Sequence, residues 1–196
     1  MIDGLGRILV GALLAVPLAA PAAVYQFTAQ LNGENEIPTQ TSPSSATGLA
    51  TLLYEDATNT YDFALSAFGL SSDVNGAHIH GQATAGEAAQ VRVSLLGAEF
   101  VPYNPSGTGT LLIGGDNVAA PQNPMPATNG HPEQSFLAML RGGLAYINIH
   151  TLNKPSGEIR GQLLEVAVVP EPVTSALMLC GLGVIAFTLR GRLRKV

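Results

Sequence analysis

The segments GAHIHG (residues 76–81) and YINIHT (residues 146–151) carry three of the four histidines of the chain: His78, His80 and His150. Side chains on a strand alternate between its two faces, so a strand over each segment places its histidines on one face and its apolar residues on the other. Adjacent strands lie about 4.8 Å apart, which lets imidazoles from two neighbouring strands meet at one ion. A His-x-His pair with a third histidine suits copper or zinc.

A fourth ligand is less well defined. His131 lies in a proline-rich stretch, residues 114–132, and is the candidate that the sequence offers. The same pattern also fits a polar outer sheet face, on which His78, His80, His150 and Asn148 form hydrogen bonds with loop backbone. The spacing leaves both interpretations open, and a plain polar face is the commoner outcome of such a pattern.

The elements that must position these residues are short strands separated by turn residues. Alternation predicts strands near residues 25–33, 49–54, 60–65, 77–80, 90–95, 109–113, 145–150 and 158–166, and a short helix over residues 133–141. Residues 114–132 contain four prolines and follow neither the strand nor the helix period, which predicts a long loop. The sequence therefore predicts an all-β domain: an antiparallel β-sandwich or Greek-key barrel of about eight strands.

Residues 1–22 have the layout of a secretory signal peptide. Arg7 precedes a short apolar run over residues 8–18, and Ala20-Pro21-Ala22 offers a cleavage site of the A-x-A type. The run is too short to span a bilayer as a helix. We therefore expect the chain to be exported.

The other end predicts a membrane anchor. Residues 173–189 are largely apolar, about 25 Å long as a helix, and four cations follow within residues 190–195. The cations favour a cytoplasmic tail, which leaves residues 24–168 outside.

With the preceding Pro170-Glu171-Pro172, residues 169–196 resemble the PEP-CTERM sorting signal of Gram-negative bacteria. The resemblance implies an exosortase as a partner that cuts near this motif. It also implies a place at the cell surface or in the extracellular matrix, after the inner membrane, of a bacterium that makes extracellular polysaccharide.

Composition excludes several classes of function. Between Val24 and Val168 there are twelve acidic and four basic side chains, a net charge of about −8, which disfavours nucleic acid as a partner. The one cysteine, Cys180, lies in the apolar C-terminal segment, so the exported domain has no disulfide. The sequence contains no G-x-S-x-G elbow, H-E-x-x-H helix or glycine-rich phosphate loop, and we expect no enzyme of these kinds.

Several segments in order resemble the CHRD (chordin-type) domain, and they span most of residues 27–164. They are FTAQLNGENEIP, ATGLATL, GAHIHG, YINIHT and PSGEIRGQL. The resemblance implies an all-β binding or structural module without an assigned reaction, and the positions that carry over are Glu36, His78, His80, Asn148, His150, Glu158 and Arg160. Alternation puts Glu158 and Arg160 on one strand face. We expect a buried structural pair between Glu36 and Arg160, because arginine can grip a carboxylate with two hydrogen bonds.

Two functions follow as hypotheses. The first is an exported, anchored CHRD module that binds extracellular polysaccharide or protein in a matrix. The second is a copper- or zinc-binding protein that uses His78, His80 and His150, since GAHIHG also resembles the copper strand of copper-zinc superoxide dismutase. The chain lacks that family's zinc ligands and disulfide, so this resemblance supports metal binding more than a copper redox reaction.

Overall fold

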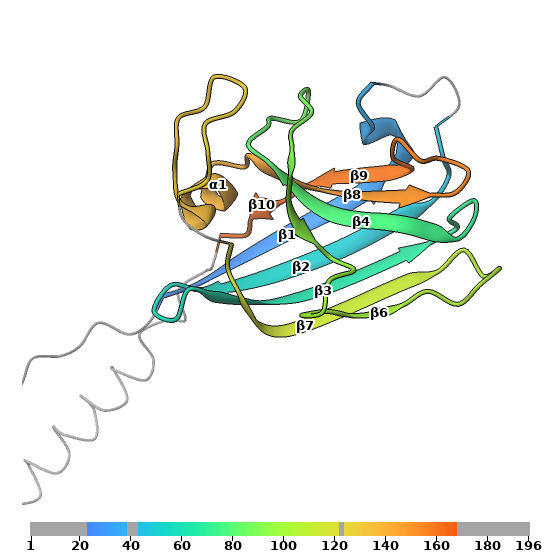
Figure 1. Cartoon of the computed structure of the whole chain (residues 1–196), viewed down its shortest axis with the longest axis horizontal. Helices are drawn as coiled ribbons and strands as arrows, with labels where there is room; N and C mark the ends of the chain where they lie inside the picture. The colour runs from blue at the N-terminus through green and yellow to red at the C-terminus, as the bar shows by residue number, and fades with distance from the viewer. Residues whose placement is uncertain (1–22, 39–42, 122–123, 168–196) are drawn as a thin grey trace, which may run out of the picture.

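Ten strands of one antiparallel sheet build the fold (Figure 1). The computed structural model describes residues 23–38, 43–121 and 124–167. Along the sheet the order is β5-β4-β8-β9-β1-β2-β3-β7-β6, and β10 also pairs with β1. The strands are β1 (Val24–Asn32), β2 (Thr47–Glu55), β3 (Thr60–Phe68), β4 (Val74–Gly81), β5 (Val91–Ser94), β6 (Val101–Tyr103), β7 (Leu111–Ala119), β8 (Ala145–Thr151), β9 (Ile159–Gln162) and β10 (Leu164–Glu165).

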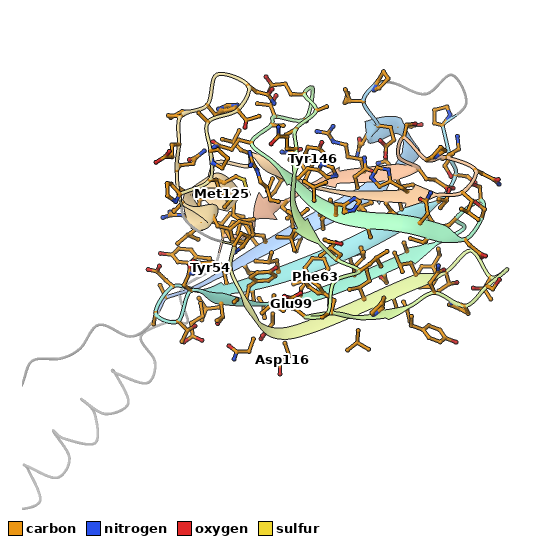
Figure 2. The ribbon with its side chains drawn as sticks, viewed as in Figure 1. Tyr54, Phe63, Glu99, Asp116, Met125 and Tyr146 are labelled. Carbon is orange, nitrogen blue, oxygen red and sulfur yellow. The ribbon has the colours of Figure 1, made fainter. Side chains whose placement is uncertain are left out.

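The sheet curls around a single apolar core. Alternate residues of each strand point inward, as Phe27, Ala29 and Leu31 do on β1, while Gln30 between them is exposed. In Figure 1 the β4–β8–β9 part of the sheet lies over the β1–β2–β3–β7 part, and Figure 2 shows Phe63 between the two parts. The two parts therefore face each other across the core as the layers of a sandwich do, although the strands are continuous.

One end of the core is covered by the helix α1 (Phe136–Arg141). The hydroxyl of Ser135 accepts a hydrogen bond from the backbone N–H of Ala138 and so caps the first turn. Phe136 is fully buried, and its ring centroid lies 6.3 Å from that of Tyr54 and 5.7 Å from that of Tyr61. These aromatic contacts fasten the helix to the strands beneath it. Gly142 ends the helix and Gly143 follows with φ 63°.

The all-β antiparallel prediction is confirmed, with three differences in detail. The short strand β6 was not predicted, because its three residues are too few to show a period. Residues 114–119 belong to β7 and are not loop, and isolated bridges join Met125 to Gln134 and Thr128 to His131 within the remaining stretch. The expected run over residues 158–166 divides into β9 and β10 at Leu163.

The expected signal peptide, sorting motif and membrane helix lie outside the described residues. Within the described ranges, no helix is long and apolar enough to cross a membrane.

A small helical turn and a buried carboxylate close the other end of the sheet. The 3-10 helix η1 (Gly33–Asn35) follows β1. Glu158, which has no exposed surface, accepts hydrogen bonds from the Ser44 hydroxyl, the Ser71 N–H, the Ser71 hydroxyl and the Thr151 hydroxyl. Burial alone raises the pKa of Glu158, but these hydrogen bonds outweigh burial and hold it below its ordinary value. One charge thus ties the segments before β2 and β4 to the end of β8.

Replacing this carboxylate should therefore lower stability more than a surface charge change does. We expect Glu158→Ala to reduce the free energy of unfolding by roughly 3 kcal/mol, because buried donors lose a charged acceptor. Denaturant unfolding at pH 7 measures the effect. The control is Glu165→Ala, which removes only the exposed ion pair with Arg141 and should change stability by less than about 1 kcal/mol. Equal effects of the two variants would contradict this account.

Candidate metal centre

The register between β4 and β8 brings three histidines together. His80 lies opposite Tyr146, His78 opposite Asn148, and Gly76 opposite His150. The predicted alternation is confirmed: the apolar neighbours on both strands are fully buried in the core, so the histidines occupy the outer face. In Figure 2, Tyr146 lies on the upper side of the sheet, away from Phe63.

The three imidazoles form one compact cluster. The ring centroids of His78 and His150 are 5.2 Å apart, those of His78 and His80 are 5.6 Å apart, and those of His80 and His150 are 6.3 Å apart. One nitrogen from each ring can be chosen so that all three lie within 4.8 Å of one another. His80 is 9% exposed and the other two are half-buried.

The hydrogen bonds of the rings fix which nitrogens are available. His80 Nδ1 lies 2.9 Å from the Ala89 carbonyl oxygen and His150 Nδ1 lies 3.1 Å from that of Pro155. A carbonyl accepts only from an N–H, so in both rings the proton is on Nδ1 and the lone pair is on Nε2. Both Nε2 atoms, and His78 Nδ1, are buried without a hydrogen-bond partner among the described residues.

Electrostatics keep the cluster neutral. Burial lowers the pKa of His80 to about 4, and the Ala89 carbonyl only partly offsets this effect. Burial is also the main reason why the pKa values of His78 and His150 are lowered, and for His78 the neighbouring His150 lowers it further. Neutral imidazoles are the form that binds metals, so at pH 7 all three rings are ready to act as ligands.

This arrangement can hold one transition-metal ion with three nitrogen ligands. Nitrogens bound to one zinc ion at about 2.0–2.1 Å are at most about 4.2 Å apart, so the rings need only a small inward movement. The backbone carbonyls of Ala89 and Pro155 would serve as the outer partners that orient ligating histidines in known metal sites. The donor set fits copper or zinc, both of which accept imidazole.

A stack of side chains supports the cluster from one side. The ring of Tyr146 lies 4.8 Å from that of His80 with only 4° between their planes, and the guanidinium carbon of Arg160 lies 3.4 Å from the Tyr146 ring centroid on β8. Arg160 Nη2 also donates to the carbonyls of Thr84 and Glu87. The stack therefore holds the loop after β4 over the sheet, beside His80.

The expected pair of Glu36 and Arg160 is not formed in the way predicted. Both side chains are buried, at 2% exposure each, but within the described residues they make no direct ion pair. Glu36 instead accepts a hydrogen bond of 3.0 Å from Asn148 Nδ2. Burial raises the pKa of Glu36 to about 7, and the Asn148 hydrogen bond and the charge of Arg160 offset only part of this rise. The loop carbonyls and the Tyr146 ring draw the arginine away from the carboxylate.

Two other predicted site residues lie elsewhere. His131 is not part of the cluster: its Nε2 lies 3.7 Å from a carboxylate oxygen of Glu87. Glu158 does not share the outer face with Arg160, because it binds Thr151, which follows His150 and points to the opposite side. The irregular turn through Gly157, with φ 131°, breaks the alternation on which that prediction depended.

Comparison with known protein families supports the resemblance. The sequence profile of the CHRD domain matches residues 27–163. The chain belongs to the CHRD family. Searches of curated proteins and of solved structures found no significant match. In this CHRD domain the matched region includes every residue of the histidine cluster and of the stack.

Glycines at two close approaches shape the CHRD site, and sequence reasoning missed them. A Cβ at Gly76 would lie 3.0 Å from His78 Cε1 and 3.3 Å from His150 Cδ2, so the missing side chain gives the two rings their space. A Cβ at Gly157 would lie 2.5 Å from a Glu36 carboxylate oxygen. The glycine that opens GAHIHG was the signal for the first, although a strand glycine has many explanations.

Gly76→Ala should weaken metal binding without removing a ligand. The added methyl must push the His78 and His150 rings out of position, and we expect about a tenfold loss of affinity for Zn(II), as when an orienting partner is removed. Calorimetric titration measures it. Gly114→Ala is the matched control, since a Cβ there meets nothing within 4 Å. Unchanged affinity in Gly76→Ala would show that the rings bind no common ion.

The buried Glu36 predicts a pH dependence of stability. Its folded pKa of about 7 exceeds the ordinary 4.5, so the folded state holds the proton more tightly. Its contribution is therefore fully present below about pH 4.5 and is lost as the pH rises through 7, by up to about 3 kcal/mol.

Glu36→Gln should remove this contribution, so the difference in unfolding free energy between wild type and variant should shift between pH 5 and pH 8. Denaturant unfolding of metal-free protein tests this, with Glu34→Gln in the same segment as the exposed control. A constant difference across the range would contradict the prediction.

Proposed function

We propose that this CHRD domain binds one copper or zinc ion on His78, His80 and His150, and that it acts as a binding module of an exported protein. One observation carries the proposal: three buried imidazole nitrogens, each with a free lone pair, converge on one point without hydrogen-bond partners in the described structure. The established family membership supports a binding module and names no ligand.

The alternative of a plain polar face explains the cluster less well. Seven buried side-chain polar atoms lack a hydrogen-bond partner in the described part of the chain, and six of them lie on or over this face. Buried polar groups in folded proteins are nearly always satisfied. A polar face stabilised by loop backbone should pair both nitrogens of each ring, whereas here the pairing stops at the nitrogen that points away from the cluster.

The bound ion would keep an open position. Three protein ligands leave at least one coordination site of copper or zinc for water or another small ligand, as in catalytic zinc sites. Because His78 and His150 are only half-buried, such a ligand can reach the ion from solvent. We assign no reaction to it.

Export and anchoring form the second part of the proposal and are supported by sequence alone. Residues 1–22 serve as the signal peptide, residues 173–189 as the membrane helix, and Pro170-Glu171-Pro172 as the sorting motif for an exosortase-type enzyme. The domain then works at the surface or in the extracellular matrix of a Gram-negative bacterium. Its extracellular partners, polysaccharide or protein, remain a proposal drawn from these signals.

The metal site is tested by titrating Cu(II) and Zn(II) into the purified full chain, kept in detergent because of its apolar C-terminal segment. We expect one ion per chain, and a loss of affinity of at least about 100-fold in His150→Ala and in His78→Ala, because each removes a ligand. Calorimetry gives the affinity, and elemental analysis of the dialysed complex gives the stoichiometry.

His131→Ala is the matched control. It removes a histidine that lies outside the cluster, so its affinity should equal that of the wild type. Binding that persists in His150→Ala, or that disappears in His131→Ala, would place the ligands elsewhere. A chain that binds neither metal would return the cluster to a polar sheet face.

A further inference from the structure

A second cavity lies on the same outer sheet face, beyond the stack. It has a volume of about 460 Å³, within the range of small-molecule sites. Its polar lining comes from Thr28 and Gln30 on β1, Asn35 in η1, and Arg160 and Gln162 on β9. No histidine of the cluster lines it, so it is a separate site.

Arg160 brings an incompletely used charge to this cavity. Its side chain is 2% exposed, yet only Nη2 donates to carbonyls, at 3.2 Å to Thr84 and 2.7 Å to Glu87. The N–H groups of Nε and Nη1 have no hydrogen-bond partner within the described ranges. A buried guanidinium with open donors is suited to a carboxylate, which it can bind with two parallel hydrogen bonds.

The rest of the lining selects for hydroxyl groups. Among the described residues that line the cavity, Arg160 is the only charged one, so no acidic side chain competes for its donors. Gln162 Nε2 donates to the carbonyls of Ala83 and Gly143, which turns its Oε1 away as a buried acceptor without a partner. Gln30 and Thr28 add groups that both donate and accept. Such a lining satisfies a ligand that has several hydroxyls.

We propose that this cavity binds a small hydroxylated carboxylate, with the Arg160 guanidinium on the carboxylate and the side chains of Gln162, Gln30 and Thr28 on the hydroxyls. The domain as a whole is acidic, so an anion gains affinity at this point and is repelled elsewhere on the surface. The site needs no metal and goes beyond the proposed function.

Three probes separate the two recognition elements. D-glucuronate carries both, D-glucose lacks the carboxylate, and acetate lacks the hydroxyls. Ligand-observed NMR with the full chain in a non-glycosidic detergent, freed of metal by chelating resin, gives their dissociation constants. We expect D-glucose and acetate each to bind at least about tenfold more weakly than D-glucuronate, because each leaves buried polar groups of the cavity unpaired.

Variants place the binding in the cavity. Gln30→Ala should weaken D-glucuronate by about fivefold, the loss of one hydrogen bond. Gln26→Ala, on the same face of β1 but outside the cavity, should change it by less than about twofold. Both positions lie on the outer face, so both variants should fold.

Several outcomes would overturn the proposal: D-glucose that binds as tightly as D-glucuronate, acetate that does so, no binding of D-glucuronate, or equal effects of the two variants. None of these outcomes bears on metal binding by the histidine cluster, which is tested separately.

Discussion

The pairing register of β4 with β8 is the constraint on which the rest of the structure depends. It places Ala77 opposite Ile149 and Ile79 opposite Ile147 on the core side, and all four are fully buried. Because side chains alternate, the same register forces the intervening polar residues to the outer face. A slip of one residue would exchange the two sets and put imidazoles into the apolar core. Core packing therefore fixes the position of the histidine cluster.

Loops convert this outer face from a solvated surface into a site. The loop after β4 is held by Arg160 and Tyr146, and its Ala89 carbonyl orients His80. The turn between β8 and β9 supplies the Pro155 carbonyl that orients His150. Burial by these loops lowers the pKa values of the histidines and raises that of Glu36. Neutral ligands and a protonatable carboxyl thus share a common cause, removal from water.

Two buried carboxylates show how local hydrogen bonding decides charge. Glu158 receives hydrogen bonds on both oxygens and its pKa is lowered, whereas Glu36 receives one from Asn148 and its other oxygen has no partner among the described residues. The first is suited to hold segments together as a fixed anion. The second changes its protonation near neutral pH, next to a strand that carries a proposed ligand. In a domain without disulfides, such polar contacts add to what the apolar core supplies.

Much of this could be read from the sequence. Alternation in GAHIHG and YINIHT showed which residues share a face, and the turn spacing indicated an antiparallel all-β fold, because a period of two is local and independent of the rest of the chain. The CHRD segments were likewise recognisable. Only the tertiary structure decided which strands are neighbours, and with this that His131 contacts Glu87 and lies outside the cluster.

The partners of the buried charges also depended on the tertiary structure. Glu36 contacts Asn148, 112 residues away along the chain, and Glu158 contacts Ser44, 114 residues away. Such contacts are set by the curl of the sheet and the path of its loops, which no local pattern encodes. The sequence by itself determined which side chains could bind a metal; the fold determined that three of them meet.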